Sequence, residues 1–415
     1  MDAKAIVDYV GTLDCIHCGL CVSSCPTWKL TGVESSSPRG RIHLMRAVAE
    51  GELEPDADYV EEMEFCLLCR HCESVCPSGV RFGALMEAAR DGITREVGRP
   101  LAARFARWFG FRVLLPHRTL LRAAAFFGRI AQKLGLVRLF APRLAPPAIP
   151  AGAERKRLPE RTPAIGERRG EVAVLEGCVM PLLYGRVNRA TVEVLARAGF
   201  DVASPQHQTC CGSLHAHNGD LEGARALARR TIAAFEAVPG VIVVNSAGCS
   251  AHMKEYGHLF RDDAAWKERA AAFASRVRDF SEFLASGPGK AGLARALVKP
   301  STDPIAYDDP CHLCHGQRIR AQPRALLDAI PGIRRVEMAD SEACCGSAGI
   351  YALARPEASA AVLDPKIRSF VESGARTLVT ANPGCQMQWE AGFARAGVRA
   401  RVAHVAEILR EACGD

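Results

Sequence analysis

The chain of 415 residues has no long hydrophobic run. No window of 18 residues is both apolar and uncharged, which argues against a transmembrane helix. The first residues, MDAKAIVDYVG, lack the apolar core of a signal peptide and a twin-arginine pair, so we expect a protein of the reducing cytosol. The sequence also lacks a glycine-rich dinucleotide fingerprint, a Walker motif and a nucleophile paired with a base. These absences argue against an enzyme that oxidises a substrate on its own.

Acidic residues are missing from one stretch, residues 98–153, which carries ten Lys and Arg. The formal net charge of the chain is +7, and subtracting these ten charges leaves −3 for the rest. The basic character therefore belongs to one segment. Since no nucleic-acid-binding motif accompanies it, the charge argues against a nucleic acid as the partner.

Cysteine, by contrast, is abundant: the chain has 18, mostly in groups with metal-ligand spacing. Two groups follow the pattern Cys-x2-Cys-x2-Cys-x3-Cys-Pro of two-cluster ferredoxins, in which the fourth cysteine binds the other cluster. We therefore predict two [4Fe–4S] clusters. Their ligands would be Cys15, Cys18, Cys21 and Cys76 for the first cluster, and Cys66, Cys69, Cys72 and Cys25 for the second.

Zinc and disulfides are the alternatives for paired CxxC motifs. The complete spacing with its proline, present twice, favours iron–sulfur clusters, and the exchanged ligand would bring them close enough for electron transfer. Gly19 allows backbone N–H groups to approach the sulfur atoms of the first cluster. Arg70 and His71 separate the ligands of the second run. We therefore expect the two clusters to differ in potential.

The segment between the two runs predicts helix. Ser37 and Pro38 suit the start of a helix, and Gly51 suits its end. We expect a mainly helical di-cluster domain.

The second half of the chain contains an internal repeat of more than a hundred residues. In each copy, apolar strand-like runs alternate with helical stretches, which predicts an α/β unit with a mainly parallel sheet. The runs VIVV (241–244) and TLVT (377–380) predict strands that are buried on both faces. Each copy closes with a stretch that we predict to be helical, at 277–287 and 402–414.

The fold class that we expect is therefore α+β and multidomain. The predicted parts are a helical two-cluster ferredoxin-type domain (1–97), a basic amphipathic segment and linker (98–170), a first CCG repeat (171–290) and a second CCG repeat (291–415).

Each repeat carries four cysteines: one after the first strand, a Cys-Cys-Gly triplet, and a Gly-Cys after a later strand. They are Cys178, Cys210, Cys211 and Cys249 in the first repeat, and Cys311, Cys344, Cys345 and Cys385 in the second. Adjacent cysteines are too strained to bridge each other readily. Functional loops gather at the carboxyl ends of parallel strands, so we predict a metal site in at least one repeat, with these eight cysteines as the candidate ligands. A cluster, zinc, a quinone-facing redox site and inert buried cysteines remain open alternatives.

Two ferredoxin-type runs followed by a duplicated CCG region resemble the glycolate oxidase iron–sulfur subunit family. Its relatives are a subunit of anaerobic glycerol-3-phosphate dehydrogenase, lactate-utilisation proteins and heterodisulfide reductase subunits. The segments SPRGRIHLMRAV (37–48), FCLLCRHCESVCPSGVRFG (65–83) and AGCSAHMKEYGHLF (247–260) favour the glycolate oxidase branch. Each repeat departs from the common CCG pattern because no CxxC closes it, which argues against the non-cubane cluster of the heterodisulfide branch.

The resemblance implies an electron-transfer subunit that takes electrons from FAD-containing dehydrogenase subunits, which oxidise glycolate, and passes them to a quinone. It also implies a cytoplasmic protein that is peripheral on the inner membrane. The alternatives are an electron-transfer subunit for glycerol-3-phosphate or lactate, a thiol/disulfide redox subunit, and a metal-binding scaffold or sensor.

Within the basic segment, Arg118, Arg122, Arg129 and Lys133 recur near the helical period, opposite an apolar face. This pattern predicts an amphipathic helix that suits an anionic membrane surface. Docking on the body of the protein or on a partner subunit is the alternative.

Three histidines lie near the repeat cysteines. We interpret His252 as an additional ligand or a helix-surface residue, and His312 and His315 as solvated loop residues. Cys314 and Cys413 are spare thiols in this interpretation.

Overall fold

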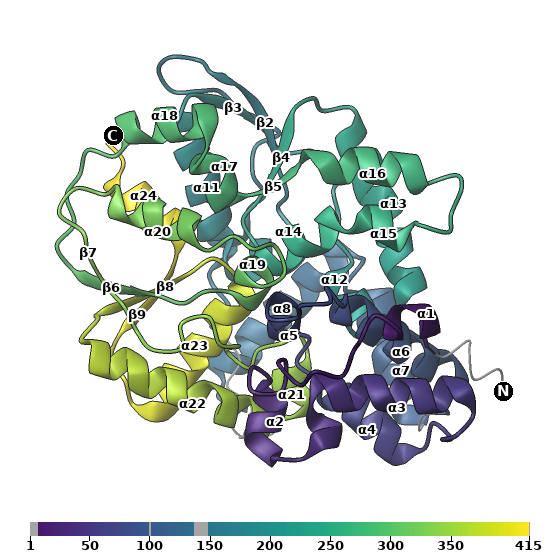
Figure 1. Ribbon diagram of the computed structural model, residues 1–415. Coiled ribbons are helices and arrows are strands. Elements are labelled where there is room, and N and C mark those ends of the chain that lie inside the picture. Colours follow the sequence, from purple (N-terminus) through teal and green to yellow (C-terminus); the bar gives the residue numbers. More distant parts are fainter. Residues whose placement is uncertain (1–6, 99–100, 137–147, 415) are drawn as a thin grey trace.

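The computed structural model describes residues 7–98, 101–136 and 148–414. A helical N-terminal domain lies beneath two α/β repeats (Figure 1). In that view the N-terminal helices run along the lower right, the sheet of the first repeat stands at the top, and the sheet of the second repeat lies at the left. The observed architecture confirms the α+β multidomain class.

Helices alone make up the regular structure of residues 7–98. They are α1 (Tyr9–Thr12), α2 (Pro26–Thr31), η2 (Glu34–Ser36), α3 (Pro38–Glu50), α4 (Ala57–Phe65), α5 (His71–Ser74) and α6 (Phe82–Glu96). The predicted helix between the cysteine runs is α3. Ser37 caps it by accepting a hydrogen bond from the backbone N–H of Gly40 at 2.9 Å, and Gly51 ends it with a φ of +78°. Met45, Met63 and Met86 pack in the core of this domain and are fully buried.

Each repeat is built on a sheet whose four parallel strands have the same order, and the first sheet has β1 as an additional edge strand. The first sheet runs β1-β3-β2-β4-β5 and the second runs β7-β6-β8-β9. The strands are β1 (Arg161–Thr162), β2 (Gly170–Val174), β3 (Phe200–Ala203), β4 (Val241–Val244), β5 (Val277–Asp279), β6 (Pro304–Tyr307), β7 (Arg334–Val336), β8 (Thr377–Thr380) and β9 (Arg401–His404). Only β1 is antiparallel among these strands; it pairs with β3 and comes from the stretch predicted as a linker. The central strands β4 and β8 match the predicted runs.

Helices surround both sheets. In the first repeat they are α10 (Met180–Leu183), α11 (Gly185–Arg197), α12 (Ser213–His217), α13 (Leu221–Glu236), α14 (Ala247–Lys254), α15 (Tyr256–Leu259), α16 (Lys267–Arg276), α17 (Phe280–Leu284) and α18 (Gly287–Ala296). In the second they are α19 (Cys311–Cys314), α20 (Ala321–Asp328), α21 (Tyr351–Ala354), α22 (Pro356–Ser373), α23 (Pro383–Ala396) and α24 (Val405–Ala412).

We predicted that the last stretch of each repeat is entirely helical, and this prediction is wrong for the first residues of each stretch. The stretches 277–287 and 402–414 begin with the edge strands β5 and β9, and the helices α17 and α24 follow without a turn. The last residue of each strand, Asp279 or His404, is also the N-cap of the helix and completes a capping box. A three- or four-residue strand that runs directly into a helix leaves little periodicity in the sequence.

One hydrophobic core extends through both repeats. It includes Val174 and Leu195 of the first repeat and Leu327 and Leu409 of the second. The backbone N–H of Ala247 also donates to the carbonyl oxygen of Ala381 at 3.3 Å, which joins the loops after β4 and β8. The repeats are therefore packed as one body.

The basic segment forms α7 (Leu101–Arg107), η3 (Trp108–Leu114) and α8 (Arg118–Lys133), and η4 (Gly152–Arg155) precedes β1. Leu121 and Ala125 of α8 are buried against Leu182 of α10. Among the described residues, no helix combines the length and the hydrophobicity that a membrane crossing requires.

Candidate metal centres

A hollow of about 420 Å³ lies in the N-terminal domain beside the first cysteine run. Its wall includes Cys15, Cys18 and Cys21 from that run and Cys76 from the second run. The structure thus brings together, from two distant segments, the four residues predicted to bind the first cluster. We call this space the first hollow.

A second hollow of about 310 Å³ adjoins it. Its wall includes Cys66, Cys69 and Cys72 from the second run and Cys25 from the first. Cys72 lines both hollows, so they are neighbours. The fourth cysteine of each run faces the hollow of the other run, as the spacing predicts.

The loops between the cysteines have the same unusual backbone in both runs. His17 and Gly19 in the first run, and Leu68 and Arg70 in the second, have φ values of 55°, 83°, 52° and 62°. This left-handed region is unfavourable for residues other than glycine. A side chain at Gly19 would also place its Cβ 2.8 Å from a guanidinium nitrogen of Arg39.

Arg70 adopts the strained conformation with a full side chain. Its guanidinium group donates to Glu73 at 3.0 Å and to Glu255 of the first repeat at 2.8 Å. These ion pairs fix the loop that carries Cys69 and Cys72. Strained backbone at such a position is typical of a functional site.

The chemistry of both hollows fits an iron–sulfur cluster. All 18 cysteines are free thiols. Five of them lie at the wall of the first hollow, where Cys72 joins the four predicted ligands, and four lie at the wall of the second. Neither lining includes an aspartate or a glutamate. Thiolates without carboxylates suit iron–sulfur clusters and zinc rather than magnesium or calcium.

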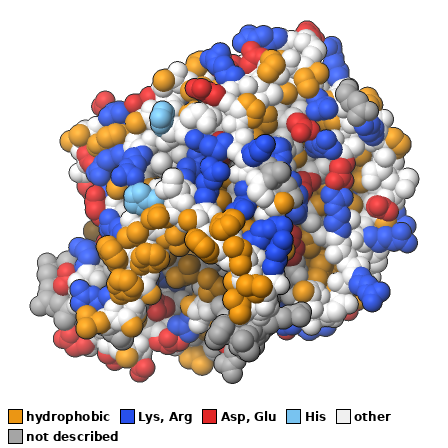
Figure 2. Space-filling view, turned by 180° about the vertical axis from the view of Figure 1, so that it is seen from behind, with side chains coloured by type: hydrophobic (Ala, Val, Ile, Leu, Met, Phe, Trp, Pro, Cys, Tyr) orange, Lys and Arg blue, Asp and Glu red, His pale blue; other side chains and the backbone are white. Residues whose placement is uncertain are grey.

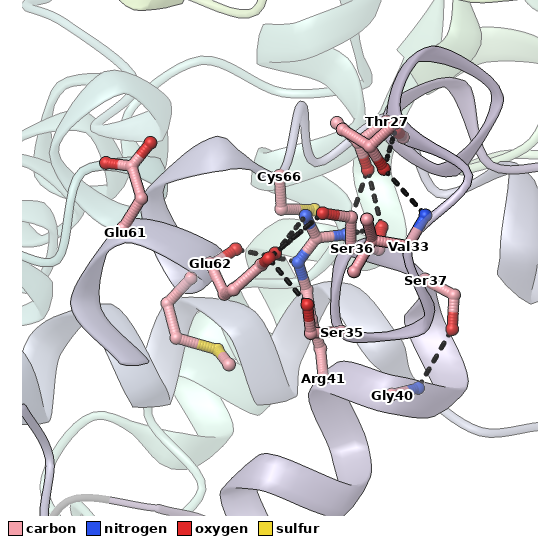
Figure 3. A network of polar contacts seen from close by, with 12 residues as sticks. Thr27, Val33, Ser35, Ser36, Ser37, Gly40, Arg41, Glu61, Glu62 and Cys66 are labelled. Carbon is pink, nitrogen blue, oxygen red and sulfur yellow. Dashed lines mark hydrogen bonds and ion pairs between the residues drawn. The ribbon is translucent and has the colours of Figure 1, made fainter. Parts of the chain in front are cut away.

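A buried arginine supports the second hollow (Figure 3). Arg41 is fully buried; it donates to the carbonyl oxygen of Ser36 at 2.6 Å and to the hydroxyl of Thr27 at 3.0 Å. It also donates to the carbonyl oxygen of Glu62 at 2.7 Å, and the hydroxyl of Thr27 lies 3.1 Å from the sulfur of Cys25. The network fixes the loop that presents Cys25.

The thiols of the first repeat form one group. Cys178 and Cys210 are close enough that hydrogen bonding with Cys210 and burial raise the pKa of the Cys178 thiol. Cys211 interacts in the same way with Cys210 and then with Cys249, and its pKa is also raised. We call these four residues the repeat-1 thiol site.

The second repeat has the same arrangement. Hydrogen bonding with Cys344 and burial raise the pKa of the Cys311 thiol, and hydrogen bonding with Cys345 and burial raise that of Cys385. We call Cys311, Cys344, Cys345 and Cys385 the repeat-2 thiol site. The structure therefore gathers every predicted cysteine of both repeats. No three His, Cys, Asp or Glu side chains in the described ranges are arranged to hold a single metal ion.

The glycine of each Cys-Cys-Gly triplet has a clear structural role. Gly212 and Gly346 have φ values of 89° and 84°, and their N–H groups donate to Cys210 and Cys344 at 3.4 Å. A Cβ at Gly346 would lie 2.4 Å from the carbonyl oxygen of Ser359 on α22. Only glycine allows this turn to present two thiols against a helix.

The two thiol sites have different neighbours. Cys69 of the second hollow packs in one hydrophobic cluster with Cys344 and with the partly buried Cys311. The repeat-2 thiol site is therefore next to the second hollow.

Helix α8 covers the repeat-1 thiol site instead, where its buried face packs with Cys178. Arg118 of α8 donates at 2.8 Å to Glu176, a buried carboxylate two residues before Cys178. In the second repeat the corresponding carboxylate, Asp309, pairs with Arg324 of the repeat's own helix α20. The basic segment thus supplies the first repeat with the cation that pairs with its buried carboxylate.

Comparisons with known proteins agree with this construction. Residues 11–80 match the model of a 4Fe-4S dicluster domain, and residues 172–254 and 305–390 match that of a cysteine-rich domain named CCG. A probable glycolate oxidase iron-sulfur subunit of Bacillus subtilis is 39% identical over 429 aligned residues, covering 99% of this chain and 96% of the relative. The glycolate oxidase iron-sulfur subunit of Escherichia coli is 35% identical over 96% of this chain and 93% of its own length.

The chain belongs to the glycolate oxidase iron–sulfur subunit family. Its dicluster domain implies two [4Fe–4S] clusters, as predicted. More distant similarity extends to a subunit of the fumarate reductase (CoM/CoB) of Methanothermobacter marburgensis, 28% identical over 97% of this chain and 72% of the relative.

In this member of the glycolate oxidase iron–sulfur subunit family, histidines line the junction between the N-terminal domain and the repeats. His217 lies 2.7 Å from the carboxylate of Glu87 on α6, and its ring stacks on that of His312 with centroids 5.0 Å apart. Burial raises the pKa of Glu87 to about 7 and lowers that of His217 to about 4. Sequence reasoning missed this pair, because α6 and α12 meet only in the fold.

The interpretation of three histidines near the repeat cysteines is corrected by the structure. His315, predicted to be solvated, is only 3% exposed and stacks on His71 of α5 at 4.0 Å. His252 is 5% exposed, so it is not a helix-surface residue. His312 is partly buried, and its Nδ1 lies 3.7 Å from the sulfur of Cys311. These histidines lie on or directly after the helices α14 and α19, and contacts with other segments bury them, which no local sequence pattern predicts.

Proposed function

We propose that this chain is the electron-transfer subunit of a complex that oxidises glycolate, and that it passes electrons from FAD-containing dehydrogenase subunits to a quinone. The first hollow would hold its cluster through Cys15, Cys18, Cys21 and Cys76, and the second through Cys66, Cys69, Cys72 and Cys25. The exchange of the fourth cysteine between two adjoining hollows carries the proposal. Relatives named as glycolate oxidase subunits over nearly the whole chain support the substrate.

When bound, [4Fe–4S] clusters supply one-electron transfer, and the protein sets their potentials and excludes water. The residues of this chain fit that task. The wall of the second hollow is largely buried, with Leu67 and Leu68 at 3% and 4% exposure. The wall of the first hollow includes His17 and the more exposed Cys18. Different solvent exposure favours different potentials, as we expect from the two runs.

We further propose a metal–thiolate centre at the repeat-2 thiol site. Its four thiols lie beside Cys69, so a centre there would extend the line of redox groups from the second hollow into the repeats. The repeat-1 thiol site has equivalent residues and is a second candidate for such a centre. Zinc is the redox-inert alternative, and metal analysis separates the two.

The test uses the chain purified without oxygen together with its flavin-containing subunits. Adding glycolate should bleach the visible absorption of the clusters, and adding a soluble quinone should restore it. Lactate and glycerol-3-phosphate are added in parallel as the comparison substrates. Bleaching by either of these and not by glycolate would refute the assignment of the substrate.

Metal and sulfide analysis of the same sample tests the thiol sites. About eight irons per chain fit the two cubanes alone, and markedly more would place iron in the repeats. A sample with zinc and neither iron nor acid-labile sulfide would refute the electron-transfer function.

A further inference from the structure

Exposed hydrophobic side chains concentrate on the basic segment. Scattered hydrophobic residues are ordinary on a protein surface, whereas a contiguous group marks an interaction site. Helix α7 buries none of its residues. The exposed large hydrophobic residues of α7, η3, α8 and residues 134–136 are Leu101, Phe105, Trp108, Phe109, Leu120, Phe126, Phe127, Ile130, Leu134 and Leu136.

Half of this group is aromatic. Phe105 is 63% exposed and lies beside Trp108 and Phe109, with ring centroids 5.9 Å and 6.2 Å away. On α8, Phe127 is 66% exposed and contacts Phe126 with centroids 5.4 Å apart. Seen from behind the view of Figure 1, the molecule shows a broad band of hydrophobic side chains with Lys and Arg beside it (Figure 2).

The charges within the basic segment itself have one sign. Residues 98–153 contain ten Lys and Arg and no Asp or Glu. Arg104, Arg122 and Lys133 are exposed on α7 and α8, and within the described part of the chain no ion pair engages them. A surface that combines exposed aromatic and aliphatic side chains with unpaired cations is complementary to an anionic lipid bilayer.

We propose that α7, η3 and α8 form a membrane-binding face that lies in the surface of a bilayer containing anionic lipids. The hydrophobic side chains enter the boundary between headgroups and acyl chains, and the cations contact the headgroups. The opposite side of α8 covers Cys178, so the bilayer surface lies on the far side of one helix from the repeat-1 thiol site. This deepens the proposed function, since a membrane quinone is its acceptor, yet lipid binding is tested independently of it.

The test measures flotation of the cluster-loaded full chain with lipid vesicles. Phosphatidylglycerol vesicles should bind the protein, phosphatidylcholine vesicles should bind it more weakly, and added salt should release it. The double variant Phe126→Ser, Phe127→Ser should lower the partition coefficient by about tenfold or more. Each of Arg122→Gln and Lys133→Gln should lower it about fivefold on anionic vesicles only.

Matched controls lie elsewhere on the surface. Leu353 is 62% exposed on α21, and Lys290 is exposed on α18, so Leu353→Ser and Lys290→Gln should leave flotation unchanged. Circular dichroism and the cluster absorption verify that each variant is folded.

Two results would overturn the proposal. One is a folded, cluster-loaded chain that fails to float with anionic vesicles. The other is a Phe126, Phe127 double variant that floats normally but no longer binds the flavin-containing subunits. That result would show that this face is a subunit interface. Bleaching by glycolate needs no vesicles, so it should survive in variants that no longer float. A chain that floats but is not reduced by glycolate would refute the proposed function and leave the membrane face standing.

Discussion

Replacing Arg41 with methionine should weaken the domain that holds both hollows. The methionine fills similar space but leaves the carbonyl oxygen of Ser36 without its 2.6 Å donor and the carboxylate of Glu62 without its cation. Removing one partner of a buried ion pair costs about 3–5 kcal/mol. Glu62 is 20% exposed and still accepts hydrogen bonds from the hydroxyls of Ser35 and Ser36. We therefore expect the lower end, about 3 kcal/mol.

Urea unfolding of the cluster-loaded chain, followed by far-ultraviolet circular dichroism and by cluster absorption, measures this loss. Arg41→Met should also release iron to a chelator faster, because Thr27 and Cys25 lose their support. Arg95→Met is the control, since Arg95 is 55% exposed and its i,i+4 pair with Asp91 contributes about 0.5 kcal/mol or less. Equal unfolding free energies and equal iron release in the two variants would refute the reasoning.

Three further predictions test other parts of the structure. Cys25→Ser should abolish the second cluster and Cys76→Ser the first, each lowering iron from about eight to about four per chain; electron paramagnetic resonance that shows the same cluster lost in both would contradict the exchange. Gly346→Ala should lower the free energy of unfolding in urea by more than about 1–2 kcal/mol, because its Cβ would meet a backbone oxygen at 2.4 Å. Gly374→Ala is the control: its φ is 69° but its surroundings are open, so it should show only the cost of placing alanine in the left-handed conformation. Equal losses of unfolding free energy in the two variants would argue against the close approach at Gly346. Burial raises the pKa of Glu87 from 4.5 to about 7, so the protonated side chain stabilises the fold below pH 4.5 and this contribution is lost as the pH rises through 7. The urea midpoint of the unmodified protein should therefore fall over this pH range, and Glu87→Gln should make that fall smaller. Parallel plots of urea midpoint against pH for the two proteins would contradict the prediction.

Features that depend on the local spacing of residues could be predicted from the sequence. The cysteine runs indicated which thiols gather at each hollow, because the turn before proline fixes the direction of the fourth cysteine. The strands β4 and β8 were predicted to the residue, because parallel strands that are buried on both faces are short uninterrupted runs rich in β-branched and apolar residues.

Contacts between distant segments account for what the sequence did not reveal. The burial of His315 depends on α5, which packs on it from more than two hundred residues away. Arg70 takes a conformation expected only of glycine because Glu255 of the first repeat anchors its side chain. The burial and the backbone conformation of such residues depend on contacts between domains. The periodicity of either segment alone does not indicate these contacts.

The core shared by the two repeats bears on how the protein works during turnover. A duplicated unit that kept separate cores could open and close along the seam between its copies. Here the apolar interior runs across that seam, and hydrogen bonds join the loops on either side of it. The distance between the two thiol sites is therefore fixed when the chain folds, and no hinge motion is needed to bring them together.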